Sequence, residues 1–269
     1  FGDNLTADGE LNGNFRAEGS LESPAVGGQL DINAERLEVG LSDPIRNFSS
    51  QIQLSQAKAI IDNAEGQFVD GEFSIDGDIN LFNPENSWNL ALKGEKLYFN
   101  HGSLEGLFDT ELQFTGSLLN PLLSGDIKTY DFVVGIPFDW PTAETGDAIF
   151  VPRIDLDVVP LEDVRVMMEN PQMQIAVESG SLNVAFDPAL EDPLRMEGRF
   201  RSTEGVFSYY NSRFKLDNAE AVFTPVDEND IPTLRANATT YAGGREINIS
   251  INGPADNMRI SLSSVPEMT

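Results

Sequence analysis

Apolar residues recur at every second position along most of this chain, which limits it to strands with one apolar face and one wet face. The pattern is clear at residues 30–34 near the start and at residues 247–251 near the end. Turn signals such as Asn-Gly at 12–13 and Asp-Gly at 70–71 separate the segments. The pattern predicts about twenty strands, most of them antiparallel because their connections are too short for crossover helices.

One segment also fits a helix. Residues 50–63 could form an amphipathic helix, yet Ile52, Leu54, Ala57, Ala59 and Ile61 fit two strands equally well. Both interpretations stay open at this point.

A short motif occurs twice. Residues 19–30 and 116–127 share the pattern Gly-Ser-Leu-x-x-Pro-x-x-x-Gly, followed two residues later by Leu or Ile. Gly253, with its apolar alternation from Met258 onward, is a looser echo. The motif indicates a strand end, a turn fixed by proline and a strand that re-enters the sheet. The alternative is that a chain rich in strands reuses turns by chance.

A sheet with one apolar face must bury or shelter that face. Covering helices are not in evidence, and about twenty strands are too many for one compact sandwich. We therefore predict an all-β fold: an elongated, curled, mostly antiparallel sheet (a β-groove, or β-taco) with an apolar interior. Residues 1–269 would form one continuous unit, or two parts, 1–134 and 153–269, on either side of a Pro-rich loop at 135–152.

Composition excludes several function classes. The 44 acidic residues outnumber the 17 basic ones and give a formal charge of −27, which argues against nucleic-acid binding. The absence of Cys and the single His exclude a thiolate zinc site and a multi-His metal site. No catalytic cluster stands out, so we expect neither an enzyme nor a metal or cofactor.

One local excess of positive charge has two interpretations. Arg195, Arg199 and Arg201 alternate along one segment and therefore share a face of the strand. They could contact a headgroup or an acidic partner. They could equally be a solvated face that neutralises neighbouring carboxylates.

From about residue 152 to residue 266, the order of features resembles the C-terminal domain of the TamB family, a subunit of the bacterial translocation and assembly module. The two Gly-Ser-Leu motifs upstream are also typical of that family. The resembling segments are Asp155-Leu156-Asp157-Val158, Asp163-Val164-Arg165-Val166, the alternation from Leu194 to Phe200, Gly205-Val206-Phe207, Phe214-Lys215-Leu216, Pro232-Thr233-Leu234, the alternation from Ile247 to Gly253, and Ile260 to Pro266.

The resemblance implies a periplasmic bridge whose apolar groove conducts phospholipids between the inner and outer membranes and supports outer-membrane protein assembly. It further implies an inner-membrane anchor in an N-terminal segment absent here. An outer-membrane barrel partner of the Omp85 type (TamA-like) would be contacted by segments at or beyond the C-terminus. The alternative is a structural or adhesive β-solenoid module of a surface protein.

The candidate groove lining is the set of apolar residues that are in phase within the strands. An even lining would let acyl chains slide without meeting a tight site. The set comprises Leu30, Ile32, Phe73, Ile75, Leu90, Leu92, Phe114, Ile154, Leu156, Val184, Phe186, Phe200, Ile249, Ile251, Ile260 and Leu262.

Overall fold

A computed structural model describes residues 5–20, 23–39, 43–136, 152–169, 172–209, 212–225, 231–255 and 257–266. Every regular element in these ranges is a β-strand, which confirms the all-β prediction. In the same ranges, no helix is present that could span a membrane.

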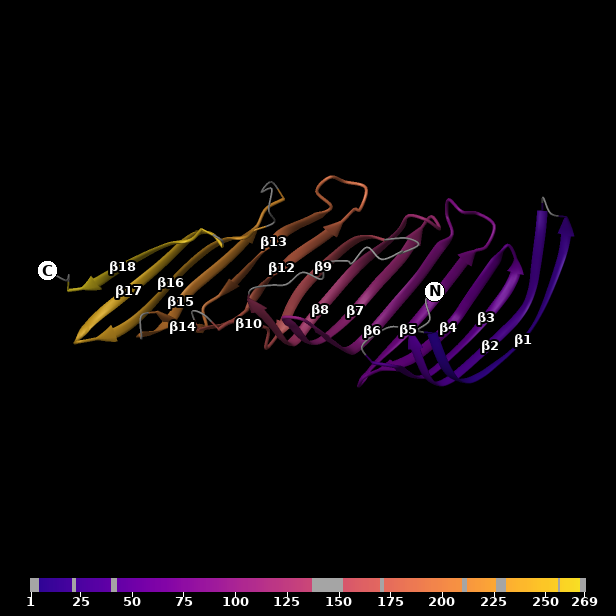
Figure 1. The fold of residues 1–269 in the computed structure, drawn as a ribbon, viewed down its shortest axis with the longest axis horizontal. Coiled ribbons are helices and arrows are strands. Elements are labelled where there is room, and N and C mark those ends of the chain that lie inside the picture. The colour runs from indigo at the N-terminus through magenta and orange to yellow at the C-terminus, as the bar shows by residue number, and fades with distance from the viewer. Residues whose placement is uncertain are drawn as a thin grey trace. The chain divides into compact units, whose positions relative to one another are not determined.

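Eighteen strands belong to one mostly antiparallel, curled sheet (Figure 1). The first eight are β1 (Leu5–Ser20), β2 (Ser23–Val39), β3 (Ile45–Gln56), β4 (Lys58–Phe68), β5 (Gly71–Asn80), β6 (Trp88–His101), β7 (Leu104–Gly116) and β8 (Pro121–Ile136). The others are β9 (Arg153–Glu162), β10 (Arg165–Met168), β11 (Met173–Ala176), β12 (Ser179–Phe186), β13 (Leu194–Ser202), β14 (Gly205–Tyr209), β15 (Ser212–Phe223), β16 (Thr233–Ala242), β17 (Arg245–Pro254) and β18 (Arg259–Val265).

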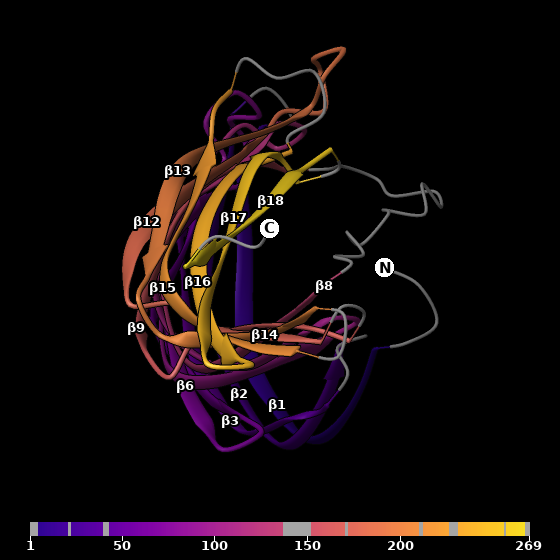
Figure 2. The ribbon, with the colours of Figure 1, turned by 90° about the vertical axis from the view of Figure 1, so that its left-hand side faces the viewer.

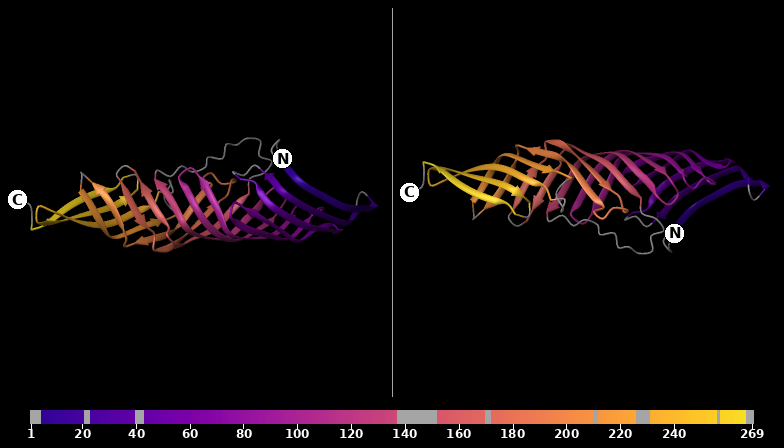
Figure 3. Two further views of the ribbon diagram at one scale, coloured as in Figure 1. Left: turned by 90° about the horizontal axis from the view of Figure 1, so that it is seen from below. Right: turned by 90° about the horizontal axis from the view of Figure 1, so that it is seen from above.

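Strands that follow one another in the sequence mostly pair as antiparallel neighbours. Strands β1 to β6 do so in an unbroken series, as do β15 to β18. Strands β1 to β5 lie side by side in both views of Figure 3. Residues 50–63 fall in β3 and β4, so the two-strand interpretation of this segment is confirmed. The pair β8 and β10 is parallel, an arrangement that the short connections did not predict.

The chain divides into two compact units. The first comprises Phe1–Tyr98, Phe108–Ile127 and Thr145–Asp155, and the second comprises Phe99–Leu107, Lys128–Glu144 and Leu156–Thr269. Most of the Pro-rich stretch 135–152 lies outside the described residues, so a division at that stretch stays a prediction.

Bulges explain how the first unit curls. The register of the β3–β4 pair shifts between Arg46 and Ser49, where Asn47 has a φ of 50°. The register of the β4–β5 pair shifts between Ile61 and Ala64. An extra residue bends the bulged strand and increases its twist. Repeated on neighbouring strands, such bends turn a flat sheet into a curved one.

The second unit bends by a related device. Strands β13 and β14 both pair with β15, but residues 203 and 204 interrupt them. In Figure 2, β14 runs crosswise to β13. The β15–β16 register also shifts between Leu216 and Asn218. The two ends of β15 therefore belong to differently oriented parts of the curled sheet.

The two copies of the repeated motif share one backbone geometry. Gly28 and Gly125 have φ values of 142° and 138°. A Cβ atom would lie 2.0 Å from the carbonyl oxygen of Asn14 at the first position and 2.1 Å from that of Glu111 at the second. Only glycine permits this close approach of two backbones. The motif thus marks the same close approach of a strand to its neighbour at both places.

Candidate functional site

Apolar side chains of neighbouring strands form transverse rows on one face of the sheet. In the first unit, Leu30 lies opposite Ile52, and Ile52 lies opposite Ile61. Farther along, Ile75 lies opposite Leu92. Directly opposed residues share a face of the sheet. The alternation in each strand therefore adds up to a continuous apolar face within this unit.

The second unit has an apolar face of the same kind. Val184 lies opposite Met196 on β13, and Phe200 on the same strand lies opposite Ala221. Ala221 in turn lies opposite Leu234 on β16. The apolar face of this unit therefore crosses from β12 to β16 without a polar row.

The structure places all sixteen predicted lining residues on strands. They lie on β2 (Leu30, Ile32), β5 (Phe73, Ile75), β6 (Leu90, Leu92), β7 (Phe114), β9 (Ile154, Leu156), β12 (Val184, Phe186), β13 (Phe200), β17 (Ile249, Ile251) and β18 (Ile260, Leu262).

Solvent exposure separates this set into three groups. Ile249 is fully buried at 0%, whereas Ile260 and Leu262 are 43% and 53% exposed. The other thirteen are half-buried. Side chains in a closed core are mostly fully buried, so this face is open along much of its length. Among the described residues, no second sheet or helix covers it.

Sequence reasoning missed part of this face. Ile52 on β3 and Ile61 on β4 are half-buried and lie in the row of Leu30. Leu54 on β3, also half-buried, lies on the same face opposite Ala59. Their alternation is visible in the sequence and could have placed them in the set.

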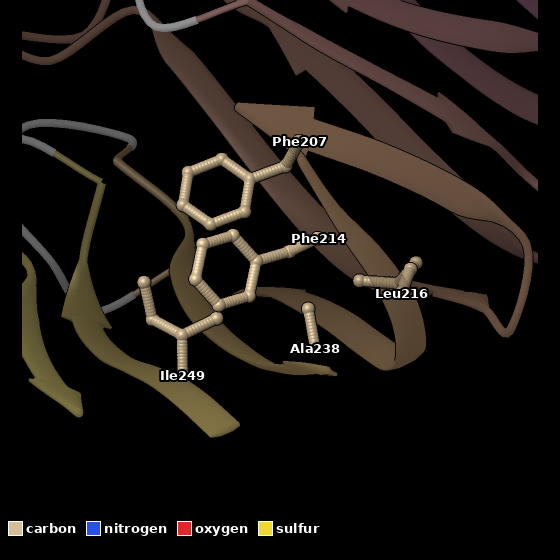
Figure 4. Close-up of a cluster of buried hydrophobic side chains, with 5 residues drawn as sticks. All are labelled: Phe207, Phe214, Leu216, Ala238 and Ile249. Carbon is tan, nitrogen blue, oxygen red and sulfur yellow. The ribbon is translucent and has the colours of Figure 1, made fainter. Parts of the chain in front are cut away.

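Burial is not uniform along the face. Phe207, Phe214, Leu216, Ala238 and Ile249 form one cluster in the second unit. In Figure 4, the rings of Phe207 and Phe214 lie next to each other, and Ile249 points toward Phe214. The centroids of the two rings are 5.7 Å apart. This part of the apolar face is closed by its own side chains.

The opposite face carries polar side chains that satisfy one another. The Nε2 atoms of Gln51 and Gln29 donate to the Asp31 carboxylate at 3.0 and 2.9 Å and hold the pKa of Asp31 below its usual value. Lys58 Nζ lies 3.0 Å from the carboxylate of Asp78, and this contact, with a hydrogen bond from Asn89, lowers the pKa of Asp78. These two carboxylates are thus kept ionised by their neighbours.

The predicted arginine group lies on the polar face of the second unit. Arg199 and Arg201 approach the Glu220 carboxylate at 3.4 and 3.1 Å, and Arg235 on β16 approaches it at 3.9 Å. Arg195 lies opposite Ala185, on the same face. The contacts to Glu220 fit the neutralising interpretation and leave a local surplus of positive charge.

The described part of the chain contains no group of three or more side chains that could hold a metal ion. Within each unit, the described candidate surface is an apolar face of the sheet with a polar opposite face.

Comparison with known proteins adds two findings. The family model of the TamB C-terminal domain matches residues 62–269. A curated relative, protein SUBSTANDARD STARCH GRAIN 4, chloroplastic, from Oryza sativa subsp. japonica, is 30% identical over 130 residues. That match covers 46% of this chain and 6% of the rice protein, so the chain spans a small fraction of that relative's length.

The family match identifies the same family that the order of sequence motifs resembles. It also begins inside β4 and so covers the greater part of both the alternating pattern and the described sheet. The chain therefore belongs to the TamB family, and residues 62–269 correspond to the C-terminal domain of that family.

Proposed function

We propose that the apolar face of this chain holds the acyl chains of phospholipids and that lipids move along it. The observation that carries the proposal is the half-open state of the face: thirteen of the sixteen predicted lining residues are neither buried nor fully exposed. A stable soluble protein seldom leaves large contiguous apolar surface uncovered unless that surface binds something.

The size of the hydrophobic effect indicates what such a face can do. Each methylene group moved out of water is worth about 0.8 kcal/mol, so some thirty methylenes of a phospholipid amount to roughly 25 kcal/mol. Shelter for the acyl chains removes most of this penalty from a lipid in transit between membranes. The headgroup would stay at the open seam of the curled sheet, in water.

This function requires no bond-making step. Apolar contacts are non-directional, so a lining of Ile, Leu, Val and Phe can hold a chain at many positions along the face. The proposal therefore assigns the chain no catalytic residue and no cofactor, and treats it as a transport module.

For the whole protein, we propose the family's role. It would be a periplasmic bridge, anchored in the inner membrane by an N-terminal segment, that carries phospholipids to the outer membrane and supports outer-membrane protein assembly. An outer-membrane barrel of the Omp85 type (TamA-like) would bind segments at or beyond the C-terminus of this chain. The family match supports this proposal.

The alternative of a structural β-solenoid fits the strand pairing less well. Solenoid coils of the β-helix type stack parallel strands. Here β1 to β6 form consecutive antiparallel pairs.

A transfer assay tests the proposal. Leu156→Asp places a carboxylate on the half-buried apolar side of β9. Ser181→Asp adds the same charge on β12 opposite Arg199, on the polar face, and is the matched control. Between donor and acceptor vesicles of phosphatidylethanolamine, Leu156→Asp should abolish transfer by the wild-type chain, and Ser181→Asp should preserve it. Full transfer by a folded Leu156→Asp variant would contradict the proposal.

A further inference from the structure

The lipid path that the apolar face offers is interrupted inside the second unit. Five side chains of β14 to β17 are almost completely buried. Their exposed fractions are 6% for Phe207, 2% for Phe214, 4% for Leu216, 3% for Ala238 and 0% for Ile249. We call these five residues the closure cluster.

The closure cluster is built from strands on both sides of the bend. Phe207 lies on β14, which runs crosswise to β13 in Figure 2, whereas Ile249 lies on β17. Met173 and Ile175 of β11 and Ile251 of β17 also pack against the cluster. Phe207 lies directly opposite Phe214, and Ala238 lies opposite both Leu216 and Ile249, so the cluster follows neighbouring strands along one face. In Figure 4, Phe214 lies between Phe207 and Ile249.

Packed side chains and an acyl chain compete for the same space. Protein interiors are packed as densely as organic crystals, so a chain of methylenes cannot enter without displacing side chains. On the near side of the cluster, Val184, Phe186 and Phe200 are half-buried, and Met196 opposite Val184 is as buried as the cluster, at 5% exposed. On the far side, Ile260 and Leu262 of β18 are exposed again.

We propose that acyl chains occupy the open face up to β13 and stop at the closure cluster, so that a lipid must leave the groove at the seam before β14. This inference rests on the proposed function, because it says where along the apolar face the acyl chains lie. It also removes Ile249 from the lipid-contacting surface and makes it part of the stop.

Photocrosslinking of the unmodified chain tests the inference without any risk to folding. The chain is incubated with phosphatidylethanolamine vesicles that contain an analogue with a diazirine in one acyl chain, then irradiated, and the adducts are mapped by mass spectrometry. We expect adducts on peptides that contain Leu30, Leu90 or Val184, and none on the five residues of the closure cluster.

Each other result has a separate meaning. Adducts on Phe214 or Ile249 at the level seen for Val184 would overturn the closure but leave the proposed function intact. A complete absence of adducts would overturn the proposed function, and this inference with it.

Two variants extend the test. Phe214→Ala removes one ring from the closure cluster and should bring adducts to the peptides of β16 and β17. Phe200→Ala, an equal truncation on the open face, should leave those peptides unlabelled. If Phe214→Ala, shown to be folded by its circular dichroism spectrum, leaves β16 and β17 unlabelled, packed side chains are not what stops the lipid.

Discussion

Truncation of two phenylalanines in the second unit separates a packed interior from an open face. Phe214 is 2% exposed in the closure cluster, whereas Phe200 is half-buried on the face that the structure leaves open. A fully buried Phe replaced by Ala typically loses about 3–5 kcal/mol of unfolding free energy, through lost transfer energy and the cavity left behind.

The expected loss for Phe200→Ala is smaller. A half-buried ring forfeits roughly half of the 1.5–3 kcal/mol transfer term, and an open face leaves no enclosed cavity. Phe200 also makes an edge-to-face contact with Phe223 at 6.1 Å, and such pairs add about 1 kcal/mol. We therefore expect a loss of about 2 kcal/mol for Phe200→Ala, against about 4 kcal/mol for Phe214→Ala.

Equilibrium urea unfolding followed by far-ultraviolet circular dichroism measures both values. The midpoints should shift by different amounts at an unchanged slope, because the slope reports the surface exposed on unfolding. Equal losses for the two variants would refute the distinction between a closed cluster and an open face.

Three further predictions concern the backbone and the polar face. Gly28→Ala should lower the unfolding free energy by about 1–3 kcal/mol in thermal unfolding, because the added Cβ would clash with a carbonyl oxygen. Gly27→Ala is the control and should be close to neutral, because the nearest atom to its added Cβ is 3.9 Å away. Glu220→Gln should destabilise the fold by about 1 kcal/mol or less at low salt, and added salt should reverse this in the same assay, because the bridged arginines then repel one another less. The lowered pKa of Asp78 contributes stability above the pKa of the unfolded chain, and this contribution is lost as the pH falls through the folded pKa. Lys58→Met should therefore raise the pKa of Asp78 in an NMR titration and make the unfolding free energy depend less on pH under acidic conditions. An unchanged pKa of Asp78 would contradict the role of the contact with Lys58.

Much of the fold could be predicted from the sequence, because apolar residues at every second position are a strong signal for strands when the pattern persists along the chain. The alternation at Leu30, Ile75 and Val184 predicted which side chains share a face, and the cross-strand pairs agree. The absence of covering helices predicted a curled sheet, and the register shifts supply the mechanism of that curl.

The positions of those bends were not predictable from the same signal. A bulge adds one residue and breaks the alternation, so Asn47 on β3 looks like noise in the sequence pattern. Only the pairing with β4 shows that it bends the strand.

The closure cluster was hidden for a different reason. Ile249 has the same alternating neighbours as Leu156 or Val184, and nothing local distinguishes them. Its burial depends on the side chains of β14 to β17 that pack around it, which is a tertiary property. The sequence therefore predicted an even lining, whereas the structure has an open stretch and a closed one.

The lipid content of the purified chain tests the central claim most directly. Native mass spectrometry would be applied to the wild-type chain, to Val184→Asp and to the matched polar-face variant Ser181→Asp. We predict bound phospholipid on the wild type and on Ser181→Asp, and its loss from a folded Val184→Asp. A wild-type chain free of lipid after incubation with phosphatidylethanolamine vesicles, or equal lipid on all three proteins, would contradict the account.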